Sequence, residues 1–474
     1  MPLRGRRPSG RCRRPHWTSR SGCSCGASNG TYDGEHFRVT ENGIQCWFGL
    51  NQLPGHRSGR TETKSVCTEP VYGARAGDPC HGATFAASSC TQGWRWNLDF
   101  VVDTRDNAAA YYYAPETGYY GTNAQRTAVA YTRGGTLSRI DYGMTASTVH
   151  AQTAPAQVVF DTSERCLPGV PAGAVCDDAH FTAANAARWP DVPVDLKCDQ
   201  GSSTCDTHTP TSWSRKRLTT ITTQVQNAGS TQQVDRWTLV HSFPDGGDHA
   251  PTLWLDSVQH TGPDTTAGGG PALTLPTTSF DPPAQLANRV GTVSNQPAMY
   301  HNRIKNVVTE SGAQTTVSYN PTECTPANLP ADPAGNTKAC FPVLWTPPGY
   351  SSTQKDWFHE YTVASVRTDD LHNANQDGTC PSPLTSYRYL GGAAWHYDDG
   401  NEFGKAEYTL PVKALQAWGY APSGIVTTYV TRYQHADGRV TERTWNYFKI
   451  LAYVPTVYPG PEAPAHVIQE MPPK

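Results

Sequence analysis

Alternating apolar and polar positions in residues 94–113 give the clearest structural signal in the chain. Every second residue in 94–102 is apolar, and Arg95, Asn97 and Asp99 lie between them on the other face. This period of two predicts a half-buried β-strand. Asp and Asn side chains favour reversal of the backbone, so we expect a turn at residues 104–107 and a returning strand through 111–113. The pattern predicts one β-hairpin.

Strand-like runs of the same kind recur along the chain at uneven intervals. They pair as residues 136–143 with 157–160, 237–243 with 252–260, the two arms of 303–319, and 429–433 with 440–445. Asp437-Gly438 lies between the last two runs and is a strong hairpin signal. Helical periodicity is scarce, and residues 181–188 and 412–417 are the best candidates. The sequence therefore predicts an all-β fold built as a series of β-hairpins, with little helix.

Composition agrees with many short strands joined by turns. Only 17% of the residues are charged, whereas Gly (42) and Pro (38) are abundant. The 474 residues suffice for two or three domains or for one large all-β body. A net charge of −3 and no basic stripe interleaved with aromatic residues argue against nucleic acid as a partner.

Fourteen cysteines indicate an oxidising compartment, and eight of them form local pairs around loop-like segments. The candidate disulfides are Cys80 with Cys90, Cys166 with Cys176, Cys198 with Cys205, and Cys324 with Cys340. A zinc site would need paired ligands at knuckle spacing, which the sequence lacks, so no metal is predicted. Structural disulfides are the favoured interpretation, and we expect an extracellular or cell-wall-associated protein.

The amino-terminal segment does not resemble an export signal. Residues 1–25 contain seven arginines, no acidic residue and no apolar run of signal-peptide length. A basic nucleic-acid-binding arm is one interpretation, and a mis-assigned or disordered lead-in is the favoured one. No transmembrane segment is predicted, because no apolar run approaches the ~20 residues that cross a bilayer.

One run carries candidate catalytic groups side by side. Trp395, His396, Tyr397, Asp398 and Asp399 bring together an imidazole, a phenol and two carboxylates, which suggests acid–base chemistry or a metal site. Neighbouring strand residues point to opposite faces, however, so His396 and Asp398 would lie on one face and Tyr397 and Asp399 on the other. A structural turn is the favoured interpretation.

A second acidic run, Asp245 to Asp248 with His249, suggests calcium binding, although one short acidic loop is more typical of a solvated turn. No nucleophile elbow, metalloprotease helix or phosphate-binding loop occurs in the sequence. The chain is therefore predicted to have no enzymatic activity and no cofactor.

The aromatic residues allow two interpretations. Thirteen tryptophans and twenty-three tyrosines on a β scaffold could present flat faces to sugar rings. Aromatic residues at strand spacing more often pack in the core or across strands. Three or more coplanar, solvent-facing rings would favour a glycan site, and burial against neighbouring hairpins would favour a structural wall.

Four segments resemble the Rhs/YD-repeat proteins of actinobacteria, which are large secreted polymorphic-toxin polypeptides. The segments are residues 29–55, 93–114, 131–143 and 387–399, and the resemblance covers roughly residues 26–405. Its most specific parts are the GGAAWHYDD run and the WRWNLD hairpin with its three tyrosines. The residues that carry these motifs are Trp94, Trp96, Asn107, Tyr111, Tyr113, Trp395, His396, Tyr397, Asp398 and Asp399. The resemblance implies a spiral of β-hairpins that closes into a hollow shell, which in longer relatives encloses a toxin domain.

The chain departs from this family at three points. Asp106 stands where the family's turn usually has glycine, so Asp106 is expected to take a positive φ. The family's signature before its self-cleavage point is missing, and no toxin domain follows. We expect a basic lead-in at 1–25, a shell segment at 26–405, and a divergent hairpin with a Pro-rich tail at 406–474.

The predicted function is that of a non-catalytic secreted scaffold, with the rest of a longer Rhs polypeptide or a toxin domain as partner. The alternative is an extracellular β protein that binds carbohydrate or cell-wall glycan.

Overall fold

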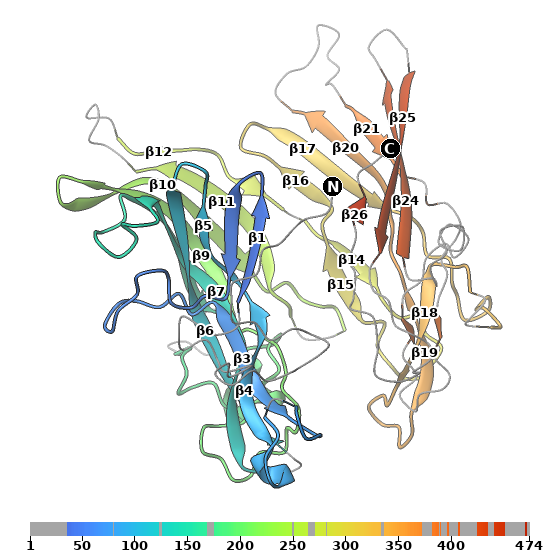
Figure 1. Ribbon diagram of the computed structural model, residues 1–474. Coiled ribbons are helices and arrows are strands. Elements are labelled where there is room, and N and C mark those ends of the chain that lie inside the picture. Colours follow the sequence, from blue (N-terminus) through green and yellow to red (C-terminus); the bar gives the residue numbers. More distant parts are fainter. Residues whose placement is uncertain are drawn as a thin grey trace, which may run out of the picture. The chain divides into compact units, whose positions relative to one another are not determined.

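The computed structural model describes residues 36–78, 80–122, 126–167, 175–248, 251–263, 271–280, 282–332, 336–371, 382–387 and 389, and strand backbone at 396–397, 406–407, 424–434, 440–450 and 470–471. These residues form antiparallel strands with a few short 3-10 helices, which confirms the predicted all-β fold with little helix (Figure 1). The chain divides into two compact units, Met1–Val240 with Gln259–Leu275 and His241–Val258 with Pro276–Lys474. The boundaries predicted near residues 26 and 405 lie outside the described residues and stay predictions.

The first unit is built on an antiparallel sheet whose strands follow one another almost in chain order. The order is β1-β2-β5-β6-β7-β8-β9-β10. The bounds are β1 Phe37–Glu41, β2 Ile44–Phe48, β5 Leu98–Val102, β6 Asn107–Gly121, β7 Ala128–Thr145, β8 Ala156–Glu164, β9 Lys216–Asn227 and β10 Ser230–Ser242. Two segments outside this order interrupt it, and both pack back onto the sheet. The first excursion is residues 49–97, between β2 and β5, and the second excursion is residues 165–215, between β8 and β9.

The predicted hairpin is present, and its turn has the expected geometry. Strands β5 and β6 pair antiparallel from Phe100 opposite Ala110 to Val102 opposite Ala108. Between them the Asp103 carboxylate accepts hydrogen bonds from backbone N–H groups of Arg105 and Asn107. The Asn107 side-chain amide also donates to this carboxylate, and this bond, followed by the backbone bond from Arg105, lowers the pKa of Asp103. Asp106 has φ +68°, as its place in the turn predicted.

The strand that leads into this hairpin is not continuous, which corrects the prediction for residues 94–102. Strand β4 (Ser89–Trp96) ends before Asn97 and pairs with β3 (Val66–Tyr72), whereas β5 pairs with β2 and β6. The break has a physical cause. The N–H of Asn97 donates to the carbonyl of Ser65, and the Asn97 carbonyl accepts from Gly49, so the backbone changes partners at this residue.

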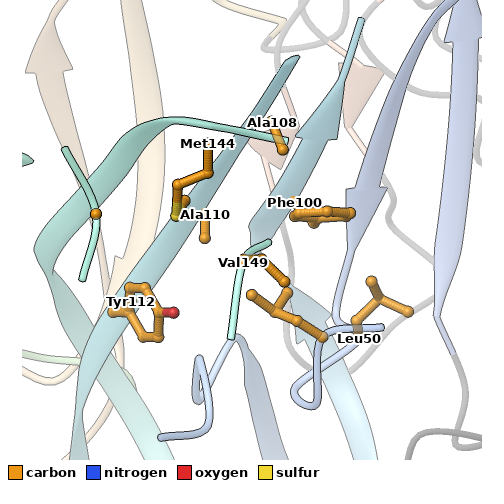
Figure 2. Packing of buried hydrophobic residues seen from close by; sticks show 9 residues of the cluster. Leu50, Phe100, Ala108, Ala110, Tyr112, Met144 and Val149 are labelled. Carbon is orange, nitrogen blue, oxygen red and sulfur yellow. The ribbon is translucent and has the colours of Figure 1, made fainter. Parts of the chain in front are cut away.

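The core of the first unit lies where the first excursion covers the sheet. Leu50 from the excursion packs with Phe100 of β5 and Tyr112 of β6 (Figure 2). Leu53 belongs to the same cluster. The cluster is completed by residues from β6, β7 and the loop after β7: Ala108, Ala110, Met144, Val149 and Ala154. Because this excursion lies over β5, Asp99 is completely buried, although the alternation had assigned it to a polar face.

The second unit is also built from antiparallel strand pairs, and its strands are shorter. One ladder has the order β13-β16-β17-β20-β21, with bounds Thr278–Ser279, Asn306–Val308, Ala313–Tyr319, Val363–Asp370 and Leu384–Ser386. Strand β11 (Trp254–Gly262) contributes to both units: Ser257 and Val258 pair with β13 in the second unit, whereas Thr261 and Gly262 pair with β12 (Leu273–Thr274) in the first. The predicted hairpin at 303–319 is β16–β17, with Gly312 at positive φ in its turn.

Smaller sheets accompany this ladder. They are β14 Ala284–Ala287 with β15 Tyr300–Arg303, β18 Cys340–Trp345 with β19 Gln354–His359, β22 His396–Tyr397 with β23 Ala406–Glu407, and β24 Gly424–Gln434 with β25 Val440–Ile450 and β26 Glu470–Met471. The pairing of β24 with β25 confirms the hairpin expected around Asp437-Gly438.

The 3-10 helices are η1 Phe85–Ala87, η3 Ala183–Arg188 and η4 Val194–Leu196. The helix predicted at 181–188 therefore exists as the 3-10 helix η3, and the one predicted at 412–417 lies outside the described residues. Among the residues that the structure describes, no helix is long and apolar enough to span a membrane.

Candidate functional site

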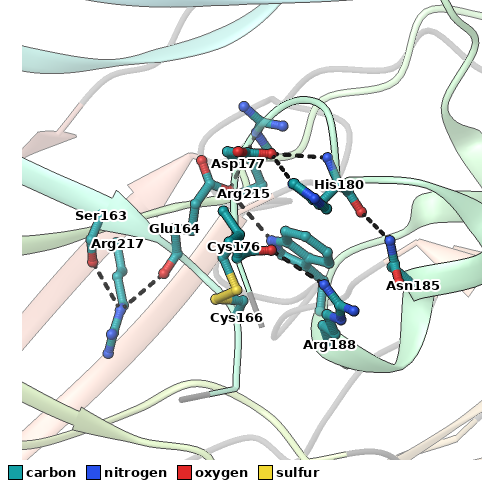
Figure 3. The surroundings of a disulfide bond; sticks show 12 residues. Ser163, Glu164, Cys166, Cys176, Asp177, His180, Asn185, Arg188, Arg215 and Arg217 are labelled. Carbon is teal, nitrogen blue, oxygen red and sulfur yellow. Dashed lines mark hydrogen bonds and ion pairs between the residues drawn. A yellow bond between two sulfur atoms is a disulfide. The ribbon is translucent and has the colours of Figure 1, made fainter. Parts of the chain in front are cut away.

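The second excursion, residues 165–215 between β8 and β9, contains the most elaborate side-chain arrangement in the first unit. The Cys166–Cys176 disulfide lies at its start and the Cys198–Cys205 disulfide near its end. Phe181 and Trp189 pack edge to face beside the first disulfide, with ring centroids 5.1 Å apart. Figure 3 shows this disulfide among the charged residues that join the excursion to β8 and β9. The excursion thus has a small apolar core of its own.

Backbone and hydroxyl hydrogen bonds attach the end of the excursion to the β6–β7 hairpin. The N–H of Cys205 donates to the carbonyl of Arg126, and the N–H of Gly121 donates to the carbonyl of Thr207. Further along, the Tyr131 hydroxyl donates to the carbonyl of Thr211 at 2.7 Å. These contacts hold the excursion as a cover over one end of the hairpin.

A cavity of about 480 Å³ lies between the excursion and strands β6 and β7. Its walls include Tyr131 and Gly118 from the hairpin and Phe181 and Trp213 from the excursion. A Cβ atom at Gly118 would come within 2.7 Å of the Tyr131 ring, so only glycine leaves room for this ring. The volume suits a small molecule.

Two buried arginines with buried glutamate partners dominate the charge of this cavity. Arg133 lies over the Trp213 ring, with its Cζ 3.8 Å from the ring centroid, and donates to the Thr117 carbonyl. The Glu116 carboxylate lies 3.5 Å from the Nε of Arg133 and accepts a hydrogen bond from Ser214. Burial lowers the pKa of the Arg133 guanidinium, and Glu116 opposes this change.

Arg215, at the end of the excursion, pairs with a buried glutamate as Arg133 does. Its Nε lies 3.5 Å from the Glu164 carboxylate, and its Nη2 donates to Asp178. Glu164 also pairs with Lys216 and accepts a hydrogen bond from the indole of Trp189. The arrangement of cations and carboxylates can bind and orient charged groups.

Each of the four cysteine pairs drawn from the sequence is a disulfide in the structure. Cys80–Cys90 joins β4 to the loop before it, and Cys324–Cys340 lies in a buried cluster with Val290 and Trp357 in the second unit. Within the described part of the chain, Cys46 and Cys67 are free thiols. Burial raises the pKa of the Cys67 thiol.

The aromatic residues of the hairpin motif pack against protein. Trp94 donates to the Thr132 carbonyl, Trp96 contacts Phe37 edge to face, and Tyr113 donates to the Leu98 carbonyl. Trp94, Trp96, Tyr111 and Tyr113 are half-buried, and Tyr112 is buried. These five side chains therefore do not form the exposed platform that sugar binding would need, which favours a packing role. Asn107 is exposed and donates to Asp103.

The other predicted site residues divide between described and undescribed segments. Trp395, Asp398 and Asp399 lie outside the described residues, and of His396 and Tyr397 only the strand backbone is described. Asp248 accepts hydrogen bonds from the backbone of Met299 and Tyr300, so its carboxylate holds a loop in place. In the ranges that the structure describes, no three potential metal ligands gather.

The cavity residues Glu116, Arg133, Trp213 and Arg215 were missed in the sequence, because 99 positions of chain separate the first from the last. One local signal pointed to them. The run 211–217, TSWSRKR, places a tryptophan beside three cations, shortly after Cys198 and Cys205. Because only 17% of the residues in the chain are charged, three consecutive cations are unusual, and they indicate a segment in which charged side chains have a structural or binding role.

No protein-family model matches the chain, and no curated protein matches it. Among solved structures, it is similar to TcdB2-TccC3, at 13% identity and a TM-score of 0.24 over 87% of this chain and 22% of that chain. TcdB2-TccC3 without its hypervariable C-terminal region gives 14% identity and a TM-score of 0.23 over 87% of this chain and 24% of that chain. This chain thus spans less than a quarter of either.

Proposed function

We propose that this chain is a non-catalytic extracellular scaffold, a segment of an Rhs/YD-type wall that encloses or presents another domain of a longer polypeptide. One observation carries the proposal. In the first unit, strand after strand pairs with its neighbour almost in chain order, from β1 to β10. A sheet built this way grows by adding hairpins along one direction, which suits a wall more than a closed catalytic body.

The excursions and disulfides support the same role. Each excursion covers part of the sheet, and disulfides close short loops within them at sequence separations of 7 and 10 residues. Covalent loop closure restricts the unfolded chain and so stabilises the folded one without a large core. Such stapling favours a protein that works outside the reducing cytosol.

The edge strand β1 supplies the test. A strand at the end of a ladder has unpaired N–H and C=O groups along one side, and among the described strands β1 pairs with β2 alone. Phe37, Val39 and Ile44 are exposed on these two strands. If the chain is a wall segment, this edge is where a further hairpin continues the wall, and the isolated chain will associate through it.

The experiment is size-exclusion chromatography with light scattering on the full chain over a hundredfold range of concentration. We expect concentration-dependent association that Val39→Lys reduces, because a charge on an edge strand opposes pairing. Val240→Lys is the matched control, since Val240 is also exposed but lies in β10, an inner strand. A monomer at every concentration, or equal effects of the two variants, would contradict the proposal.

A further inference from the structure

The cavity under the second excursion holds an exposed carboxylate on a buried cation. The Asp178 side chain is 91% exposed, and it pairs with Arg215, whose side chain is only 8% exposed. Arg215 also has a buried counterion, Glu164, so Asp178 is its second and exposed partner. An ion pair with an exposed member contributes little to stability. Asp178 therefore occupies a place on Arg215 from which a competing anion can displace it at low cost.

The second arginine of the cavity is not fully hydrogen-bonded. The Nε of Arg133 lies 3.5 Å from the Oε2 of Glu116, and in the described part of the chain neither of these two buried atoms has a hydrogen-bond partner. Arg133 and Arg215 both line the cavity, and the positive charge of Arg215 contributes to lowering the pKa of Arg133, after the larger effect of burial. An anion between two such cations relieves their repulsion.

The remaining lining also suits a polar ligand with one negative group. Lys197 and Lys216 add two further cations to the lining. Three carboxylates face them, Glu116, Asp178 and Asp199, and the last two lie at the exposed rim. Guanidinium groups bind carboxylate and phosphate oxygens by paired hydrogen bonds, which gives orientation as well as affinity.

We propose that this cavity binds a small ligand through a carboxylate or phosphate group, held between Arg133 and Arg215 after displacement of Asp178. Trp213 and Tyr131 enclose the rest of the molecule, and the volume of about 480 Å³ has room for a sugar or amino acid unit. Asp178 then acts as an internal competitor that closes the site when no ligand is present. This inference does not depend on the scaffold proposal.

Isothermal titration calorimetry of the full chain with inorganic phosphate, glucuronate and glucose tests the inference. We expect one site for glucuronate or phosphate and none for neutral glucose. Asp178→Asn should tighten binding about two- to fivefold, the strength of an exposed ion pair. Asp199→Asn is the matched control, because it removes the same charge from the same rim but leaves Arg215 paired with Asp178. Its effect should be smaller than that of Asp178→Asn.

Three outcomes would overturn the inference. They are heat from glucose equal to that from glucuronate, equal tightening by Asp178→Asn and Asp199→Asn, and absence of binding by every probe to both the native chain and Asp178→Asn. Asp178 is at the surface, so its substitution leaves the fold intact, and an unchanged thermal midpoint measured alongside the titration verifies this. Arg133→Gln, checked in the same way, should abolish binding if the second guanidinium holds the anion.

Discussion

Arg289 and Asp356 form a completely buried ion pair in the second unit, with Nε 2.6 Å from Oδ2 and side chains 1% and 0% exposed. The remaining capacity of both groups is used. Arg289 also donates to the Val293 carbonyl, and Asp356 accepts from Thr292. The pair joins the segment after β14 to strand β19, two parts of the chain 67 positions apart. A network this well satisfied fixes one arrangement of these strands.

We predict that Asp356→Asn destabilises the second unit by about 3–5 kcal/mol, because it leaves the Arg289 charge buried without its partner. Hydrogen exchange of the β18–β19 amides measures the effect locally. The double change Arg289→Met with Asp356→Leu should cost clearly less than Asp356→Asn, since it removes both charges together. A double variant less stable than the single one would contradict this account.

The same pair predicts an acid transition. Burial alone would raise the pKa of Asp356, but the hydrogen bonds from Arg289, Thr292 and the Trp357 backbone outweigh it and leave the pKa below its ordinary value. A lowered pKa means that the folded state holds its proton less tightly than the unfolded chain. The stabilisation is therefore complete above the ordinary value of 3.8 and is lost as the pH falls below it. Exchange protection of β18–β19 that stays constant from pH 5 to pH 2 would refute the prediction.

The sequence predicted those elements whose partners are local. The hairpin β16–β17 was found because its two arms and its turn lie within residues 303–319. The four disulfides were found for the same reason, since their cysteines are at most 16 positions apart. In both cases the residues that interact lie within one short segment, so residue alternation or cysteine spacing was enough to predict the pairing.

The elements that the sequence did not predict depend on distant segments. The strand at 94–102 breaks at Asn97 because Ser65 and Gly49, far earlier in the chain, provide different partners there. Asp99 is buried because the first excursion packs over β5. The alternation of apolar and polar residues within one strand does not reveal that a different segment covers the polar face. The cavity likewise joins β6, β7 and an excursion that starts after β8, so only its cationic run 211–217 was visible locally.

Asp99 should make the first unit more stable at acidic pH than at neutral pH. Burial raises the pKa of its carboxyl, although hydrogen bonds from Ser65, Asn51 and Thr63 lower it in part. A raised pKa means that the folded state binds the proton more tightly, so stability falls as the pH rises from the ordinary value of 3.8 through the raised one. Asp99→Asn is neutral and keeps an oxygen for these donors, so its urea midpoint should lose this slope between pH 4 and pH 7.

Asp103, directly after the strand that contains Asp99, provides the control because its pKa shift is in the opposite direction. Hydrogen bonds from Asn107 and Arg105 lower the pKa of Asp103, so its contribution is present above 3.8 and disappears at lower pH. Asp103→Asn should therefore leave the slope between pH 4 and pH 7 unchanged. Parallel pH curves for Asp99→Asn and the native chain would disprove the assignment.

The Cys198–Cys205 disulfide should hold the cover of the cavity in place. It closes a loop with a sequence separation of 7 residues, for which chain entropy predicts about 2.5 kcal/mol of stabilisation. We expect Cys198→Ser with Cys205→Ser to lower the denaturation midpoint and to speed proteolytic cleavage within residues 165–215. Cys324→Ser with Cys340→Ser is the control, because that disulfide lies in the second unit. Equal cleavage rates of the excursion in both double variants would show that Cys198–Cys205 has no local role.

The turn residue Asp106 is the position where one substitution should stabilise the hairpin. Its φ of +68° places a Cβ atom in the left-handed region, which costs an ordinary residue about 1–2 kcal/mol. Glycine has no Cβ and relieves this strain, at the cost of extra freedom in the unfolded chain, so Asp106→Gly should gain up to about 1 kcal/mol. Asp106→Val should lose stability, because a β-branched side chain tolerates positive φ least. Arg105→Gly is at the neighbouring position, which does not have a positive φ, so it relieves no strain. It only increases the conformational freedom of the unfolded chain and should be slightly destabilising. Urea midpoints in the order Gly, native, Val at position 106 would establish the strain, and a Gly variant less stable than the native chain would exclude it.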